Sequence, residues 1–208
     1  MPSFYDRLSP FYERLTHYFE GPAREMGLEL LAPAAGERLL EIGPGSGGML
    51  PRLAEGVGPA GAVHALDLSA GMLAACQKHR QASPLGARIH LCQGNACQLP
   101  YPAANFDGLY LSFTLELFTA STMPRLLAEC RRVLRPGGRL VAVTLYRPDP
   151  PPLTVRLYTA LHRRWPKQLD CRPIQTATLL TVAGFLPVQE QTTSVGGLPV
   201  AIVLARRD

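Results

Sequence analysis

The chain has 208 residues, of which 47% are hydrophobic and 18% are charged, and these proportions exclude a disordered chain. No apolar run approaches the roughly 18 residues that span a bilayer, and charged residues interrupt the N-terminus where a secretory signal would be apolar. The five cysteines are odd in number and form no C-x-x-C pair, so we expect a reducing, cytoplasmic environment.

The formal net charge is +5, and much of the excess lies in residues 125–172, which hold ten arginines and one lysine against three acids. Such a segment can attract an anionic substrate or an anionic membrane surface, although a solvated basic face is the simpler interpretation. Aromatic residues are not interleaved with a basic run as in single-strand nucleic-acid platforms, so we expect no nucleic-acid partner. Peripheral membrane contact and the oligomeric state stay open.

The N-terminal segment is rich in aromatic residues. Apolar residues follow at roughly helical spacing, and these are Phe4, Leu8, Phe11, Leu15, Tyr18 and Phe19. Pro10 divides them, and a further helix is predicted from Pro22 to Leu31. We predict an N-terminal helical lid over residues 1–35, with packing against the sheet edge as the alternative. The hydroxyl of Tyr12 makes the lid a candidate source of a catalytic group.

Residues Arg38 to Ile42 predict a short buried strand that runs into a glycine loop, with a helix from Gly47 to Glu55. Gly43, Gly45 and Gly48 fit the dinucleotide fingerprint G-x-G-x-x-G, in which backbone approaches a ligand closely. Glu41 is unusual, because a carboxylate near the end of an apolar strand costs desolvation unless it meets a positive group. It favours a ligand with an ammonium group over one with a pyrophosphate.

Strands and helices alternate beyond this loop. We expect strands over residues 61–66, 88–92, 106–112 and 139–145, a helix capped by Ser69 that runs to about residue 81, a helix over residues 123–134, and a turn over residues 135–138. This order predicts an α/β fold with a doubly wound parallel sheet. A ligand then lies beyond the carboxyl ends of the strands, where Glu41, Asp67, Asn95 and Ser112 fall.

The alternation breaks at residues 146–175, where four prolines within residues 148–152 and a short helix over residues 154–164 suggest an insertion or substrate cap. A helix over residues 176–183 follows. Two strands, over residues 187–194 and 199–205, are joined by Gly196 and Gly197 and predict an antiparallel hairpin. We therefore expect one domain over residues 1–208, with a cofactor-binding core at 36–145 and a terminal helix and hairpin at 176–208.

Two cofactors suit this architecture. A nicotinamide nucleotide needs the glycine loop to hold its pyrophosphate, whereas S-adenosylmethionine needs the loop to pass a methionine chain and an acid to hold the ribose. Asp67 lies 22 positions beyond Gly45, close to the ~20-residue offset of a ribose-binding acid. Glu41 and the terminal hairpin favour S-adenosylmethionine.

Five motifs in order resemble the class I S-adenosylmethionine-dependent methyltransferases, and among these the ubiquinone/menaquinone biosynthesis branch. They are Leu-Glu-Ile-Gly-Pro-Gly-Ser-Gly (40–47), Ala-Leu-Asp-Leu-Ser-Ala-Gly-Met-Leu (65–73), Gly-Asn-Ala-Cys-Gln-Leu-Pro-Tyr-Pro (94–102), Asn-Phe-Asp (105–107) and Val-Leu-Arg-Pro-Gly-Gly-Arg-Leu (133–140). The resemblance implies a Rossmann-like sheet of seven strands, the last antiparallel. It also implies methyl transfer to a small-molecule or lipid-like acceptor.

The resemblance also implies roles for individual residues. The methionine part of the cofactor would be lined by Gly43, Gly45 and Gly47 and hydrogen-bonded by Ser46. The ribose would be held by Asp67, with Leu68 beside it. The adenine edge would meet Asn95 and Ala96, and Ser112 would lie beside the methyl group. If the acceptor must lose a proton, the candidate bases are Glu116 and Tyr12, with His17 and His162 as further options. No metal site is expected.

One departure from the family concerns the acceptor. The quinone methyltransferases carry an Arg-Asn pair in the stretch after the serine, where this chain has Glu116 and Leu117. This difference argues against a quinone as the acceptor. Two other functions stay open at this point: a non-catalytic S-adenosylmethionine-binding protein and a nicotinamide-dependent oxidoreductase.

Overall fold

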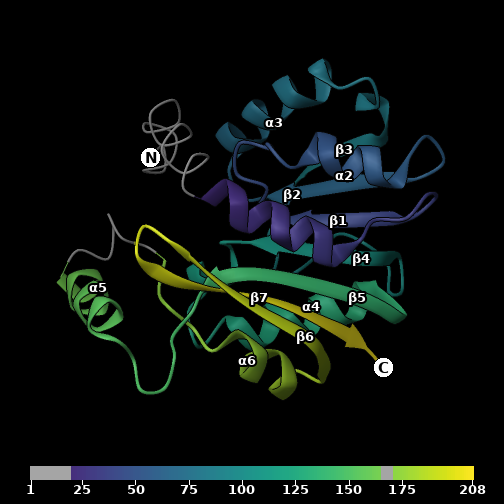
Figure 1. Cartoon of the computed structure of the whole chain (residues 1–208). Helices are drawn as coiled ribbons and strands as arrows, with labels where there is room; N and C mark the ends of the chain where they lie inside the picture. Colours follow the sequence, from purple (N-terminus) through teal and green to yellow (C-terminus); the bar gives the residue numbers. More distant parts are fainter. Residues whose placement is uncertain (1–19, 165–170) are drawn as a thin grey trace.

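The computed structural model describes residues 20–164 and 171–208, and one sheet of seven strands runs through them (Figure 1). The strands are β1 (Arg38–Ile42), β2 (Ala62–Asp67), β3 (Ile89–Gln93), β4 (Phe106–Ser112), β5 (Leu134–Leu145), β6 (Phe185–Val195) and β7 (Leu198–Arg207). They are arranged in the order β3-β2-β1-β4-β5-β7-β6. The expected N-terminal helices over residues 1–19 lie outside the described residues.

The direction of the strands agrees with the prediction. β1 pairs in parallel with β2 and β4, while β2 pairs in parallel with β3 and β4 with β5. β7 is antiparallel to both β5 and β6, and the hairpin turns at Gly196 and Gly197, which both have positive φ. The doubly wound, mostly parallel sheet with an antiparallel terminal strand is therefore confirmed. Its strand order reverses between β1 and β4, where such folds place a ligand.

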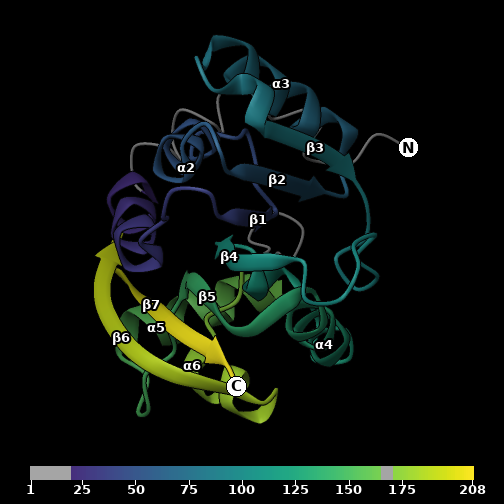
Figure 2. The same ribbon diagram turned by 90° about the vertical axis from the view of Figure 1, so that its right-hand side faces the viewer.

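Helices cover both faces of this sheet. They are a helix over residues 20–31, α2 (Leu50–Val57), α3 (Ala70–Ala82), α4 (Met123–Val133), α5 (Leu153–Arg164) and α6 (Thr176–Val182), with 3₁₀ turns at Gly86–Arg88 and Leu115–Leu117. One apolar core joins α4 and α6 to the sheet, and the other joins the helix over residues 20–31 with α2 and α3. Figure 2 shows α2 and α4 on opposite sides of the sheet.

Two predicted boundaries are wrong for identifiable reasons. The helix expected from Gly47 begins at Leu50, because Gly47 has a φ of +87° and belongs to the loop. The turn expected at residues 135–138 lies within β5. Phe106 of β4 pairs with Leu134 of β5, and Gly108 pairs with Arg139. The extra residues of β5 between these two pairs form a bulge rather than a break between elements. The predicted cap is confirmed, since the side chain of Ser69 accepts a hydrogen bond from the amide of Met72.

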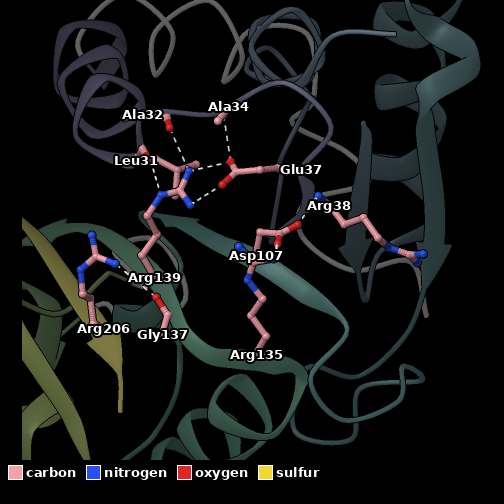
Figure 3. Close-up of polar contacts among 10 residues, drawn as sticks. All are labelled: Leu31, Ala32, Ala34, Glu37, Arg38, Asp107, Arg135, Gly137, Arg139 and Arg206. Atoms are coloured by element: carbon pink, nitrogen blue, oxygen red, sulfur yellow. Dashed lines mark hydrogen bonds and ion pairs between the residues drawn. The ribbon is translucent and has the colours of Figure 1, made fainter. Parts of the chain in front are cut away.

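A polar network closes the edge of the sheet where the parallel strands begin (Figure 3). The guanidinium of Arg139 donates to the carbonyls of Leu31 and Ala32 at the end of the first described helix, and to both carboxylate oxygens of Glu37 at 2.7 Å each. Burial alone would raise the pKa of Glu37, but hydrogen bonds from Arg139 and the amide of Ala34 bring that pKa below its ordinary value. The network ties the helix over residues 20–31 to β5.

We expect Arg139→Gln to lower the free energy of unfolding by about 2–3 kcal/mol at neutral pH, measured by urea denaturation. The substitution leaves a largely buried carboxylate and two helix-end carbonyls without their donor. Because the pKa of Glu37 is depressed, this stabilisation is present at neutral pH and is lost as the pH falls through that pKa. Arg206→Gln is the control: it loses only an exposed bond to Gly137 and should change stability by less than about 0.5 kcal/mol. If the two variants unfolded at the same urea concentration, the Arg139 network would not stabilise the fold as argued.

Candidate functional site

A cavity of about 460 Å³ opens at the carboxyl ends of β1, β2 and β4, beside the point where the strand order reverses. Its wall is built from several loops and from the helix over residues 20–31. The lining residues are Glu20, Arg24, Ile42, Gly43, Gly45, Leu66, Asp67, Leu68, Ser69, Met72, Gly94, Asn95, Ala96, Ser112, Phe113, Thr114, Leu117, Phe118 and Cys171. Seven of the ten predicted cofactor-binding residues lie on this wall.

The glycine loop after β1 forms one side of the cavity. Gly45 has a φ of +56°, and a side chain at this position would meet nothing within 4 Å, so the backbone there is open to a ligand. A Cβ on Gly43 would lie 2.7 Å from the side chain of Thr114. A Cβ on Gly47 would lie 2.9 Å from the backbone of Cys76. Gly47 and Ser46 are not among the lining residues, and Gly47 instead lets the loop pack against α3.

Asp67 ends β2 on the next side of the cavity. One of its carboxylate oxygens accepts a hydrogen bond from the amide of Ser69 at 2.8 Å. Burial raises the pKa of Asp67, while backbone hydrogen bonds from Ser69, Leu68 and Gly45 act in the opposite direction. The adjacent Leu68 is 72% exposed although it is apolar, which leaves its side chain available to cover a flat ring.

The segment after β3 brings Asn95 and Ala96 to the same wall. The side-chain oxygen of Asn95 accepts a hydrogen bond from the amide of Cys97 at 2.9 Å, which shapes a tight turn. Ala96 is 7% exposed and packs in the core beneath the cavity. The ends of three neighbouring strands thus meet around one cavity.

The end of β4 closes the cavity on the remaining side. Ser112 is buried, and Phe113 has a φ of +51°, a left-handed conformation that an aromatic residue rarely adopts. The hydroxyl of Thr114 lies within hydrogen-bonding distance of the carbonyl of Ser112 at 3.0 Å and of the carbonyl of Gly43 at 3.4 Å. These contacts join the loop after β4 to the glycine loop. Backbone strain of this kind is concentrated at functional sites.

Two predicted acidic residues lie behind the cavity wall rather than on it. Glu41 is 2% exposed, one of its oxygens has no hydrogen-bond partner among residues 20–164 and 171–208, and burial raises its pKa to about 7 despite the charge of Arg24. Glu116 is 1% exposed and accepts a hydrogen bond from the amide of Leu145 at 3.0 Å. Burial raises the pKa of Glu116 to about 8. Tyr12, the other predicted catalytic residue, lies outside the described residues.

The helix over residues 20–31 contributes two charged residues that the sequence analysis missed. Arg24 and Glu20 both line the cavity and form an ion pair at 2.6 Å, with each side chain 17% exposed. The guanidinium of Arg24 lies over the ring of Phe113 at 5.9 Å from its centre, and the hydroxyl of Tyr110 donates to the carbonyl of Arg24. The spacing of Glu20 and Arg24, four apart, was the available signal for this pair.

The two buried carboxylates predict a pH dependence of stability. Between the ordinary pKa of about 4.5 and the raised values, the unfolded chain loses protons that the folded chain keeps, so stability falls as the pH rises. We expect the free energy of unfolding of Glu41→Gln, measured relative to that of the native protein, to increase as the pH rises toward 7. The increase is at most about 1.4 kcal/mol per pH unit. Urea denaturation at several pH values measures this difference. Glu55→Gln, at an exposed position, should show no such difference from the native protein. If the stabilities of Glu41→Gln and the native protein changed with pH in parallel, the buried Glu41 would not be the cause.

Comparisons with known proteins show a similarity to methyltransferases. A family model described as a methyltransferase domain matches residues 39–138. The chain is 30% identical over 151 residues to a 2-phytyl-1,4-naphtoquinone methyltransferase of Trichormus variabilis, covering 71% of this chain and 65% of that relative. It is 39% identical over 116 residues to a ubiquinone/menaquinone biosynthesis C-methyltransferase of Dinoroseobacter shibae, covering 56% and 45%. Over these residues the chain is similar to the class I S-adenosylmethionine-dependent methyltransferases.

The structural comparison shows the same fold in a solved structure. A methyltransferase from Aquifex aeolicus described as SAM-dependent superimposes with a TM-score of 0.69 at 21% identity, over 98% of this chain and 97% of that one. S-adenosylmethionine is the cofactor of the family. The chain spans less than two thirds of the length of the first curated relatives that it matches.

Among residues 20–164 and 171–208, His, Cys, Asp and Glu side chains form no group that could hold a metal ion. In the same part of the chain, none of the helices is both long enough and apolar enough to cross a bilayer.

Proposed function

We propose that this protein transfers a methyl group from S-adenosylmethionine to a small-molecule or lipid-like acceptor. The observation that carries the proposal is the convergence of Gly45, Asp67 and Asn95, from the ends of β1, β2 and β3, on one cavity. An open glycine backbone, an acid and a polar turn suit a methionine chain, a ribose and an adenine respectively. The open backbone at Gly45 and the exposed Leu68 support a cofactor at this position.

The charged residues around the cavity suit the amino-acid end of the cofactor. Arg24 lies on the wall and would hold the carboxylate, since a guanidinium is a preferred partner for that group. Glu41 lies behind the wall with one unpartnered oxygen, and its negative charge would favour the ammonium. Asp67 would accept hydrogen bonds from the ribose hydroxyls, with Leu68 and Asn95 beside the adenine.

The chemistry asks little of the protein beyond alignment. When bound, the cofactor supplies an electrophilic methyl carbon on a sulfonium. Phe113, Leu117 and Phe118 line the cavity and would exclude water from the acceptor and hold it in line. Where the acceptor must lose a proton, we favour Glu20 over Glu116 as the base, because Glu20 lines the cavity and burial raises its pKa.

The acceptor is proposed only by class. Leu117, which stands in the stretch where quinone methyltransferases have an Arg-Asn pair, lines the cavity with 44% of its surface exposed, and this favours an apolar acceptor. A bilayer would be a source of such an acceptor, so we retain the peripheral membrane contact that the basic segment leaves open. We also place the protein in the cytoplasm, because its five cysteines are odd in number and form no C-x-x-C pair.

The first test is ligand binding. S-adenosylhomocysteine should raise the melting temperature of the protein and give a measurable heat in calorimetry, whereas NADH should do neither. Protection by NADH alone would support a nicotinamide-dependent oxidoreductase instead.

The second test is turnover. The protein is incubated with fractionated cell extract and S-adenosylmethionine labelled in its methyl group, and mass analysis identifies any compound that gains the label. A labelled product that requires the protein supports an enzyme. Binding of the cofactor with no product from any fraction would support a non-catalytic binding protein. Heat-denatured protein is the control.

A further inference from the structure

The helix α5 (Leu153–Arg164) exposes a row of leucines. Leu153, Leu157 and Leu161 are 76%, 60% and 37% exposed, and their spacing of four residues places them on one face of the helix. In Figure 1, α5 stands away from the sheet at one end of the molecule. Three leucines together on one short helix are more than the scattered apolar residues of an ordinary surface.

The opposite face of α5 attaches it to the protein. Val155 is its one buried residue, and the hydroxyl of Tyr158 donates to the carbonyl of Cys171 at 2.9 Å. With 100° of rotation per residue, Val155 projects away from the leucine row, and Tyr158 lies between Val155 and the end of the row at Leu161. The leucines are therefore not turned toward the described parts of this chain.

The charge of α5 distinguishes between possible partners. The helix carries Arg156, Arg163, Arg164 and His162 and has no acidic residue. Arg156 and Arg163 lie along the flank of the leucine row, where long side chains can keep their charge at a headgroup while leucines enter a bilayer. A second copy of this chain would bring like charges together. A surface with anionic headgroups and an apolar interior complements both features.

We propose that α5 docks in the interface of an anionic membrane. Its leucines enter the acyl-chain boundary, and its arginines contact phosphate groups. The helix lies in the plane of the bilayer, because its 12 residues are too few to cross the hydrocarbon core.

This docking places the membrane near the cavity. Cys171, which α5 holds through Tyr158, lines the cavity, and the neighbouring Arg172 donates to the carbonyl of Phe118 at 2.6 Å. Phe118 lines the cavity as well. Delivery of a lipid-like acceptor from the bilayer into this cavity rests on the proposed function, whereas the docking itself does not.

The test is co-sedimentation of the full chain with vesicles, without cofactor or acceptor. We expect binding to vesicles that contain phosphatidylglycerol, weaker binding to phosphatidylcholine alone, and loss of binding as salt is raised. The variant Leu153→Gln/Leu157→Gln/Leu161→Gln should bind anionic vesicles roughly tenfold or more weakly. The variant Arg156→Gln/Arg163→Gln/Arg164→Gln should also bind more weakly and lose most of its salt dependence.

The matched control changes three other exposed apolar residues, in Val182→Gln/Leu186→Gln/Val188→Gln, and should bind as the native chain does. Circular dichroism and melting temperature check that each variant folds. The proposal is overturned if the native chain ignores anionic vesicles, or if the leucine variant binds them as the native chain does. It is also overturned if the leucine variant merely converts a dimer to a monomer in solution. Since no cofactor is present, a failure of methyl transfer leaves this result unaffected.

Discussion

Asp67→Ala is expected to weaken the binding of S-adenosylhomocysteine by about 10- to 100-fold, measured by titration calorimetry. In the proposed site the carboxylate of Asp67 accepts hydrogen bonds from the ribose hydroxyls. The expected loss corresponds to about one such bond to a charged group, which contributes about 1.5–3 kcal/mol. Asp67 lies on the cavity wall at the end of β2, so no rearrangement is needed to bring it to the ligand. The expected loss is large because Asp67 is the one acidic residue of β2 and of the turn that follows it, over residues 62–70.

The same carboxylate also shapes its own loop, because it accepts a hydrogen bond from the amide of Ser69. Asp67→Asn separates the two roles: it keeps an oxygen for the amide of Ser69 but loses the charge, and we expect an intermediate affinity. Urea denaturation then shows whether the alanine variant is folded under the conditions of the titration. Unchanged affinity in a folded Asp67→Ala would remove this residue from the proposed site.

The sequence predicts best those parts of the fold that are determined by residues close together in the chain. β1 and β4 have the predicted boundaries, Arg38–Ile42 and Phe106–Ser112, since each is an apolar run bounded by turn residues. Ser69 caps α3 because its hydroxyl needs only a neighbouring amide. The direction of the parallel strands could be predicted because strands and helices alternate along the chain, and this alternation is visible in the sequence.

The errors arise where a distant element decides the outcome. Gly47 has its positive φ in a loop that packs against Cys76 of α3, a contact that its own neighbours do not reveal. Glu116 follows β4 as a candidate base would, yet the amide of Leu145 holds it inside the protein. Arg24 reaches the cavity only because its helix crosses the sheet there. Each case depends on residues far apart in the sequence.

The cluster around Arg24 gives the prediction with the largest effect on stability. The guanidinium pairs with Glu20 at 2.6 Å, and its positive charge also lowers the pKa values of the buried Glu41 and Glu116. Arg24→Gln leaves these three carboxylates without that charge. We expect the free energy of unfolding to fall by about 3–5 kcal/mol at pH 8, measured by urea denaturation.

The loss should be smaller at pH 6, because Glu41, with a pKa of about 7, and Glu116, with a pKa of about 8, then hold their protons in the folded state. Arg52→Gln is the control, since this arginine pairs with Glu25 on the surface with 53% of its side chain exposed; it should change stability by less than about 1 kcal/mol at either pH.

Adding Glu41→Gln to Arg24→Gln tests the coupling directly. At pH 8 the double variant should recover part of the lost stability, because one uncompensated carboxylate is gone, and the two effects will then not add. At pH 6 the recovery should be small. A loss that is equal at both pH values, or strictly additive effects at pH 8, would show that Arg24 stabilises the protein through packing rather than through charge. Calorimetry at pH 6, where the variant is more stable, then measures what Arg24 contributes to S-adenosylhomocysteine binding apart from stability.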